Sequence, residues 1–186
     1  MSKHEIRTKV KKLRGLLSEL ERAEAAERVF DKLEKTAAFL LADRILMYHS
    51  LPDELDTHAF LRKWASRKRF FLPRVSGLDL EILPYDEATL SEGSYHIQEP
   101  HGSRLAKLED MEMIVVPGVA FDSKGNRLGR GKGFYDRMLQ GSKAPKIGVA
   151  YELQIVESIP AETHDIRMDM IITDRTTIIC SQTVSK

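Results

Sequence analysis

The chain has 186 residues, which suits one domain of ordinary size that buries a single core without disulfides. Lysine and arginine total 29 against 28 aspartates and glutamates, so no global basic field attracts nucleic acid and any anion must be bound locally. No apolar run approaches the roughly 20 residues that span a bilayer, and the N-terminal segment is charged rather than apolar. We therefore expect one domain over residues 1–186, in a soluble, cytoplasmic protein that binds neither membranes nor nucleic acid.

The cysteine content leaves little room for thiol chemistry. The only cysteine, Cys180, lies in the apolar run 177–180, which predicts a buried and inert thiol. A single cysteine excludes a disulfide or a cysteine-based metal site within one chain.

The N-terminal segment has the periodicity of helices. A first amphipathic helix is predicted by apolar residues that recur every three or four positions among charged ones, namely Ile6, Val10, Leu13 and Leu17. Ser18 and Glu21 then form a capping box, which predicts the start of a second helix. The apolar positions of that second helix are Val29, Leu33 and Leu40.

Short apolar runs flanked by turn residues follow, and they predict buried strands at residues 45–49, 70–74, 113–117, 146–151 and 170–173. Helical patterns lie between several of them, near residues 57–66, 133–140 and 152–158. This alternation predicts an α/β layered fold with a central, mostly parallel sheet flanked by helices. Ligands of such sheets bind in loops beyond the carboxyl ends of the strands. Residues 77–103 are expected to include a hairpin or a lid.

The most informative segment spans residues 114–136, IVVPGVAFDSKGNRLGRGKGFYD, and combines a strand, a glycine-rich loop and a helix start. Its glycines allow positive φ angles and a close approach to a ligand; they are Gly125, Gly129, Gly131 and Gly133. Cations are interleaved with them, namely Arg127, Arg130 and Lys132. The combination favours a polyphosphate-binding loop over a merely flexible turn. It is neither a Walker A nor a G-x-G-x-x-G loop, because glycine follows Lys132 and Phe134 occupies the last glycine position.

Two carboxylates are candidates for holding magnesium. Asp136 follows Lys132 by four residues on the first helical turn, where it could hold the ion against phosphate oxygens. The alternative is a helix-start aspartate that is stabilised by the helix dipole. Asp165 lies in a loop before the run 170–173, where a solvated turn residue is the alternative.

These segments resemble the 5-formyltetrahydrofolate cyclo-ligases, also called methenyltetrahydrofolate synthetases, along the whole chain. The most specific match is PGVAFDSKGNRLGRGKGFYDRML at residues 117–139. Weaker matches are Lys3 and Arg7, PDELDT at 52–57, LPR at 72–74, IQEP at 97–100, and the tail at 147–165 followed by DMIIT. One departure is His96, which stands where the family commonly has glycine, in a local turn or one wall of the folate pocket.

The resemblance implies a role for each matched residue. It assigns ATP binding to Lys3, His4, Glu5, Ile6, Arg7, Arg127, Leu128, Gly129, Arg130, Gly131, Lys132, Gly133, Phe134 and Tyr135. It assigns substrate contacts to His49, Glu54 and Tyr135, catalysis to Lys132, Arg130 and Tyr135, and magnesium to Asp136 and Asp165. From the residues alone, the pattern around Lys3 and Arg7 favours an ordinary solvated face of the first helix over an ATP contact. Glu54 could be a plain loop carboxylate and His49 a surface histidine.

The resemblance also implies an activity, the ATP- and magnesium-dependent conversion of 5-formyltetrahydrofolate to 5,10-methenyltetrahydrofolate. In the family mechanism the formyl oxygen attacks the γ-phosphate, N10 closes the ring, and phosphate leaves. Phosphoryl transfer needs alignment and charge neutralisation rather than a protein nucleophile, which agrees with a site of glycines, cations and carboxylates.

Two other functions are open to the same residues. A sugar-phosphate isomerase or CoA-transferase-like enzyme would use the glycine loop for a substrate phosphate, together with a carboxylate base or nucleophile. An RNA-binding module would use the scattered lysines and arginines, but the near-neutral charge and the lack of interleaved aromatic residues argue against it. The expected partners are small molecules only, 5-formyltetrahydrofolate and ATP, bound by a monomer or weak dimer.

Overall fold

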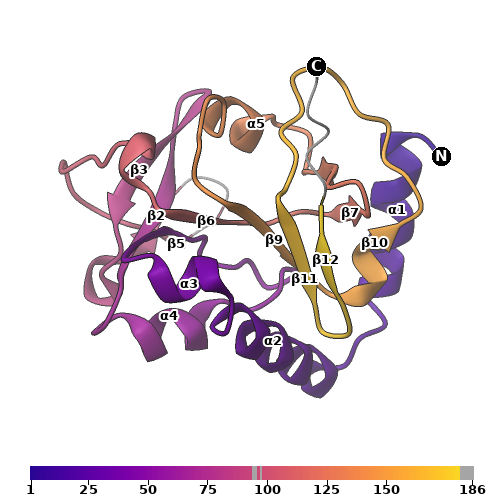
Figure 1. The fold of residues 1–186 in the computed structure, drawn as a ribbon, viewed down its shortest axis with the longest axis horizontal. Helices are drawn as coiled ribbons and strands as arrows, with labels where there is room; N and C mark the ends of the chain where they lie inside the picture. The colour runs from indigo at the N-terminus through magenta and orange to yellow at the C-terminus, as the bar shows by residue number, and fades with distance from the viewer. Residues whose placement is uncertain (94–95, 97, 181–186) are drawn as a thin grey trace.

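A computed structural model describes residues 1–93, 96 and 98–180 of the chain. Its centre is a seven-stranded sheet with the order β12-β11-β9-β6-β1-β2-β3 (Figure 1). Neighbours from β11 to β2 pair in parallel, whereas the edge strands β12 and β3 pair antiparallel. These strands are β1 (Arg44–Leu46), β2 (Arg69–Ser76), β3 (Asp79–Pro84), β6 (Met113–Val116), β9 (Lys146–Ala150), β11 (Met170–Thr173) and β12 (Thr177–Ile179). The predicted α/β fold with a mostly parallel sheet is confirmed.

Helices cover the sheet on both faces. They are α1 (Lys3–Arg14), α2 (Glu19–Leu33), α3 (Ala37–Leu41), α4 (His58–Trp64) and α5 (Phe134–Met138). Figure 1 shows α2, α3 and α4 together on one side of the sheet and α5 on the other. Single 3-10 turns span Glu87–Thr89, Leu108–Asp110 and Glu152–Gln154.

Alternate side chains of the strands face opposite sides of the sheet, and both sides are buried. Ile45 and Met113 belong to the core cluster under α2, α3 and α4. Leu46 and Ile114 belong to the second cluster, which also contains Leu139 at the end of α5. Burial on both faces explains why the parallel strands are continuous apolar runs in the sequence.

The helical predictions are correct in part. Both N-terminal helices begin at capping boxes, with Ser2 and Glu5 for α1 and Ser18 and Glu21 for α2. However, α2 ends at Leu33, and a separate short helix begins after its own cap at Thr36. The continuous second helix through Leu40 is therefore wrong, and the Leu40 side chain is exposed. The predicted helix at 152–158 is also wrong, because the 3-10 turn there leads directly into β10 (Ile155–Val156).

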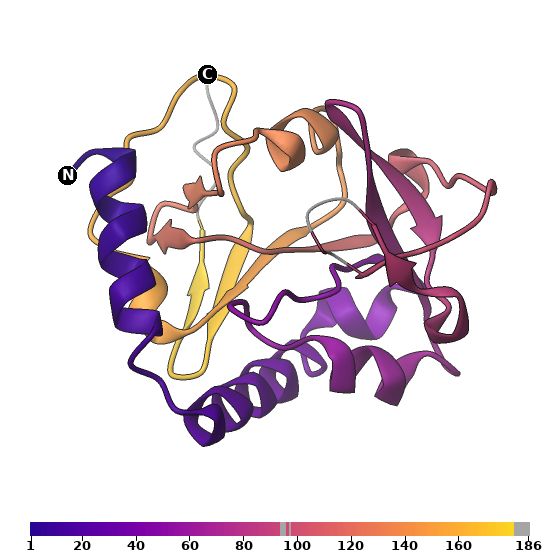
Figure 2. The ribbon, with the colours of Figure 1, turned by 180° about the vertical axis from the view of Figure 1, so that it is seen from behind.

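A smaller three-stranded sheet lies beside the central one, and α1 packs against it (Figure 2). It has the order β10-β7-β8, with β7 at Ala120–Asp122 and β8 at Arg127–Leu128. Ile6 and Val10 of α1 pack in one cluster with Ala120 and Leu128. The first helix is thereby fixed next to β8, the strand that leads into Gly129, Gly131 and Gly133.

The segment 77–103 contains the predicted hairpin. β2 and β3 are joined by a tight turn, and β4 (Ser91–Glu92) pairs antiparallel with β5 (Gln98–Glu99). His96 has φ 58°, a left-handed conformation that favours glycine. This φ agrees with the glycine that the resemblance leads us to expect at the position, while Tyr95 and Ile97 lie outside the described residues. Cys180 is buried as predicted, and burial raises the pKa of its thiol to about 11.

Among the described residues, none of the helices combines the length and the apolar character that crossing a bilayer requires.

Candidate active site

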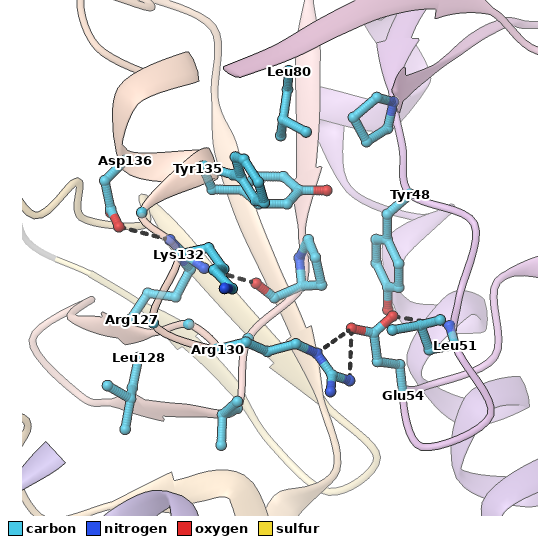
Figure 3. A pocket seen from close by; sticks show the side chains of 18 of the residues that line it. Tyr48, Leu51, Glu54, Leu80, Arg127, Leu128, Arg130, Lys132, Tyr135 and Asp136 are labelled. Carbon is cyan, nitrogen blue, oxygen red and sulfur yellow. Dashed lines mark hydrogen bonds and ion pairs between the residues drawn. The ribbon is translucent and has the colours of Figure 1, made fainter. Parts of the chain in front are cut away.

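A cavity of about 620 Å³ opens where the strand order reverses (Figure 3). After β1 the chain adds β2 on one side, and it later adds β6 on the other, so the carboxyl ends of β1 and β6 flank a crevice. Such switch points are the common ligand sites of open α/β sheets. The cavity is lined by Lys3, Arg7, Tyr48, His49, Leu51, Glu54, Pro73, Val75, Leu80, Gln98, Glu99, Pro117 to Val119, Arg127 to Asp136, Glu162, His164 and Asp165.

Most residues assigned to the site from the sequence therefore share one cavity. The exceptions are His4, Glu5 and Ile6, which do not line it. Ile6 is buried in the core under α1, and Glu5 caps the helix by accepting the Ser2 N–H at 2.6 Å. The side chain of Lys3 instead reaches the cavity from the first turn of α1.

The first half of the glycine-rich motif is structural. The Asp122 carboxylate is 1% exposed and accepts the backbone N–H groups of Lys124, Asn126 and Ile159 at 2.9–3.1 Å. Gly125 has φ 85°, and a side chain there would meet the backbone of Met168. This turn sends the chain back as β8 and fixes the start of the loop that follows.

The second half of the motif forms one wall of the cavity. Gly131 and Gly133 have φ 100° and 69°, which other residues rarely adopt. Arg7 of α1 donates through Nε to the Gly129 carbonyl at 2.9 Å, so the helix supports the loop. Lys132 lies at the exposed tip between the two left-handed glycines.

Arg127 is the buried cation of this wall. Its side chain is 4% exposed and donates to Asp136 Oδ2 at 3.2 Å and to the Pro117 carbonyl at 3.2 Å. Its guanidinium carbon also lies 5.4 Å from the centre of the Tyr135 ring. Burial raises the pKa of the Tyr135 phenol, with a contribution from Glu54, so the hydroxyl remains protonated and can donate a hydrogen bond.

Asp165 lies beside the N-terminus of α1. Its Oδ2 accepts the Lys3 ammonium at 3.1 Å and the Glu162 N–H at 2.9 Å. Burial acts to raise the pKa of the Asp165 carboxyl, but these two donors outweigh it and lower the pKa. The carboxylate therefore stays ionised at neutral pH.

Glu54 stands at the opposite end of the cavity, in the loop after β1. It accepts the Leu51 N–H at 3.0 Å, and its other oxygen accepts Arg130 at 3.2 Å (Figure 3). Burial raises the pKa of Glu54 above its usual range, while the Leu51 N–H and Arg130 oppose the shift. The contact between Arg130 and Glu54 was not visible in the sequence, where 75 residues separate the two.

His49 lines the cavity near the same loop. Its ring stacks on His58 of α4 with centroids 3.8 Å apart. Burial, together with the neighbouring His58, lowers the pKa of His49 to about 4. The imidazole is therefore neutral at physiological pH and offers a hydrogen bond and a flat surface rather than a positive charge.

Sequence reasoning missed an apolar wall that faces the glycine loop. Pro73 and Val75 of β2 and Leu80 of β3 line the cavity, and the LPR match at 72–74 was the only signal for them. Figure 3 shows Leu80 and Tyr135 next to each other above the cations. Glu99, which is buried and accepts the Val75 N–H at 3.0 Å, was also missed. The cavity is thus charged on one side and apolar on the other.

The two carboxylates predicted to bind magnesium fit that ion only if a bound polyphosphate supplies further oxygen atoms. The described residues contain no group of three or more histidine, cysteine, aspartate or glutamate side chains that could hold a metal ion by themselves. Asp136 and Asp165 both line the cavity, however. Magnesium is usually held by one or two carboxylates, phosphate oxygens and water. The pair therefore suits magnesium that arrives with a polyphosphate.

Comparisons with known proteins agree with this arrangement. Residues 1–174 match the model of the 5-formyltetrahydrofolate cyclo-ligase family. A 5-formyltetrahydrofolate cyclo-ligase of Haemophilus influenzae is 32% identical over 176 residues, 88% of this chain and 93% of that one. The NMR structure of Aquifex aeolicus 5,10-methenyltetrahydrofolate synthetase is 35% identical, with a TM-score of 0.89, and the match covers 100% of this chain and 96% of that one.

A more distant synthetase shares the fold. The 5,10-methenyltetrahydrofolate synthetase of Mycoplasma pneumoniae is 23% identical with a TM-score of 0.77, and the match covers 94% of this chain and 99% of that one. Fold, family model and relatives agree over nearly the whole sequence. The chain therefore belongs to the 5-formyltetrahydrofolate cyclo-ligase family, whose members are ligases.

Proposed function

We propose that the protein converts 5-formyltetrahydrofolate to 5,10-methenyltetrahydrofolate at the expense of ATP, in a single domain that needs magnesium. The observation that carries the proposal is the division of one cavity into a wall of glycines and cations and a wall with Glu54, Pro73 and Leu80. The first wall suits a triphosphate. The second suits a flat, partly apolar pterin that needs a few fixed polar contacts.

In the proposed reaction the formyl oxygen attacks the γ-phosphorus, and ADP leaves. N10 then attacks the activated formyl carbon and loses its proton to the departing phosphate, as the C–O bond breaks and the phosphate leaves with the former formyl oxygen. Lys132 and Arg130 neutralise charge on the transferring group, since phosphoryl transfer relies on positioning and electrostatics. Tyr135 lies between the two walls, where its hydroxyl donates a hydrogen bond to the substrates and its ring excludes water from the reacting atoms. Asp136 and Asp165 would hold magnesium, which supplies positive charge beside the phosphates.

An absorbance assay for the methenyl product tests the proposal. Product is expected from 5-formyltetrahydrofolate only when ATP and magnesium are both present. Turnover of a sugar phosphate or a CoA thioester, without product from the folate, would favour the isomerase or transferase alternative.

Glu54→Gln is expected to weaken 5-formyltetrahydrofolate binding by about tenfold, because an acceptor oxygen becomes a donor facing a substrate N–H. ATP binding should not weaken, because its contacts are assigned to the α1 and glycine-loop residues. Calorimetric titration with each ligand measures both affinities. The matched control is Glu157→Gln, an exposed glutamate outside the cavity. An equal loss for both ligands, or a loss for ATP alone, would remove Glu54 as the pterin anchor.

Asp136→Asn is expected to raise the magnesium concentration for half-maximal activity by about tenfold, because the amide keeps an oxygen ligand but loses the charge. Magnesium titration at fixed ATP measures the effect, with Asp31→Asn on the exposed surface of α2 as the control. If Asp136→Asn leaves the magnesium titration unchanged, Asp136 does not hold the ion and serves only as the ion-pair partner of Arg127.

A further inference from the structure

The proposed reaction assigns Arg130 to the nucleotide, yet its side chain is paired with Glu54, which the same reaction assigns to the folate. Its Nη2 donates to Asp53 Oδ1 at 2.6 Å. The same Nη2 donates to Glu54 Oε1 at 3.2 Å, and Nε lies 3.4 Å from that Glu54 oxygen (Figure 3). The cation expected to neutralise the transferring phosphate is thus paired with the carboxylate expected to hold the pterin. In this arrangement neither group is fully available to its ligand.

Asp53 is held in place by buried contacts although its side chain is partly exposed. Its second oxygen, Oδ2, accepts Arg14 Nη2 at 2.6 Å, and the Arg14 side chain is only 7% exposed. Arg22 of α2 donates to the carbonyls of Arg14 and Pro52, both at 3.0 Å. Two helices therefore fix the loop and the carboxylate that face Arg130.

We propose that Asp53, which is fixed by Arg14, holds the Arg130 guanidinium in an ion pair with Glu54, and that this pair acts as a clamp that both ligands must open. Nucleotide and folate therefore strengthen each other's binding. The inference rests on the proposed function. The γ-phosphate offers Arg130 several charged oxygens, which match a guanidinium better than a shared carboxylate does. When Arg130 moves to the phosphate, Glu54 can accept the pterin N–H groups without a competing cation.

The coupling follows because both ligands must separate the same ion pair. The first ligand to bind meets that cost, and the second no longer does. By thermodynamic linkage, the factor by which nucleotide strengthens folate binding equals the factor by which folate strengthens nucleotide binding. Asp53 is thus a positioning residue, since it acts on the substrates only through Arg130.

Calorimetry of the wild-type protein measures the coupling. 5-Formyltetrahydrofolate is titrated alone, with a non-hydrolysable β,γ-imido analogue of ATP and magnesium, and with ADP and magnesium. Folate binding is expected to tighten about fivefold or more with the analogue. ADP, which lacks the γ-phosphate, should give no gain.

Asp53→Asn separates the clamp from general effects on the fold. Asparagine can keep its oxygen on Arg14 while its amide N–H₂ faces Arg130 and releases it. Folate alone should then bind more tightly than it does to the wild type, and the analogue should add less than about twofold. A merely structural role for Asp53 would not tighten binding. Asp56→Asn, in the same loop but bonded to Ser50 and the His58 N–H, is the control that should retain the coupling.

Arg130→Gln tests the clamp from the other side and should abolish the gain with the analogue, even if Asp53→Asn does not fold. Independent binding of the two ligands by the wild type, or full coupling in either variant, would overturn the clamp and leave the proposed function standing. Failure of the wild type to bind either ligand would overturn both.

Discussion

Lys132→Ala is expected to lower kcat about 100-fold or more while leaving the fold unchanged. Lys132 lies at the exposed tip of the loop between Gly131 and Gly133, so its truncation removes no core packing. Loss of one cation at a transferring phosphoryl group raises the barrier by a few kcal/mol, which corresponds to roughly that factor in rate. Product formation by the absorbance assay measures kcat, and a thermal melt checks the fold.

Lys124→Ala is the matched control for this variant. Lys124 is an exposed lysine of the same motif, but it lies in the Asp122 turn and does not line the cavity. Its truncation should leave kcat unchanged. Full activity of Lys132→Ala, or an equal loss in both variants, would remove the catalytic assignment of the loop.

Asp122→Ala should have the largest effect on stability. It would leave the N–H groups of Asn126 and Ile159 without their acceptor in a buried turn, and the Asn126 side chain also loses its partner at 2.9 Å. Each orphaned buried donor costs about 1–3 kcal/mol, so the free energy of unfolding should fall by about 3 kcal/mol or more. The midpoint of urea unfolding measures the change.

An exposed aspartate with a similar bond provides the comparison. Asp86 also accepts a backbone N–H two residues ahead, that of Ala88 at 3.0 Å, but it lies at the surface. Water can replace its carboxylate, so Asp86→Ala should cost about 1 kcal/mol or less. If the free energy of unfolding falls by similar amounts in the two variants, burial of the Asp122 hydrogen bonds adds nothing to their contribution to stability.

Local signals predicted the parallel strands and the helix starts well. The strands near Ile45, Met113 and Ile171 are buried on both faces, so each appears as an uninterrupted apolar run. The capping boxes marked both N-terminal helix starts. The end of α2 was missed because Leu40 continues the apolar spacing, although its side chain faces solvent. Periodicity reports apolar positions, and only the tertiary packing decides which of them are buried.

The contacts across the cavity could not be predicted in this way. The glycines and cations of the loop suggested a phosphate site, yet no local pattern places Arg130 on Glu54 or Lys3 on Asp165. Glu54 follows β1 and Arg130 follows β8, whereas Lys3 belongs to α1 and Asp165 to the loop before β11. Both pairs therefore arise from the tertiary packing of segments that are far apart in the sequence. The helix after the loop is also shorter than expected, from Phe134 to Met138, so the glycine backbone and the cations carry most of the expected anion affinity.

Transfer of the formyl oxygen tests the central claim most directly. Substrate labelled with oxygen-18 in the formyl group is converted with ATP and magnesium, and the released phosphate is examined by phosphorus NMR or mass spectrometry. Attack of the formyl oxygen on the γ-phosphate predicts one labelled oxygen in each phosphate, formed in equal amount to the methenyl product. Unlabelled phosphate accompanying the same product would contradict phosphoryl transfer to the substrate in this cavity.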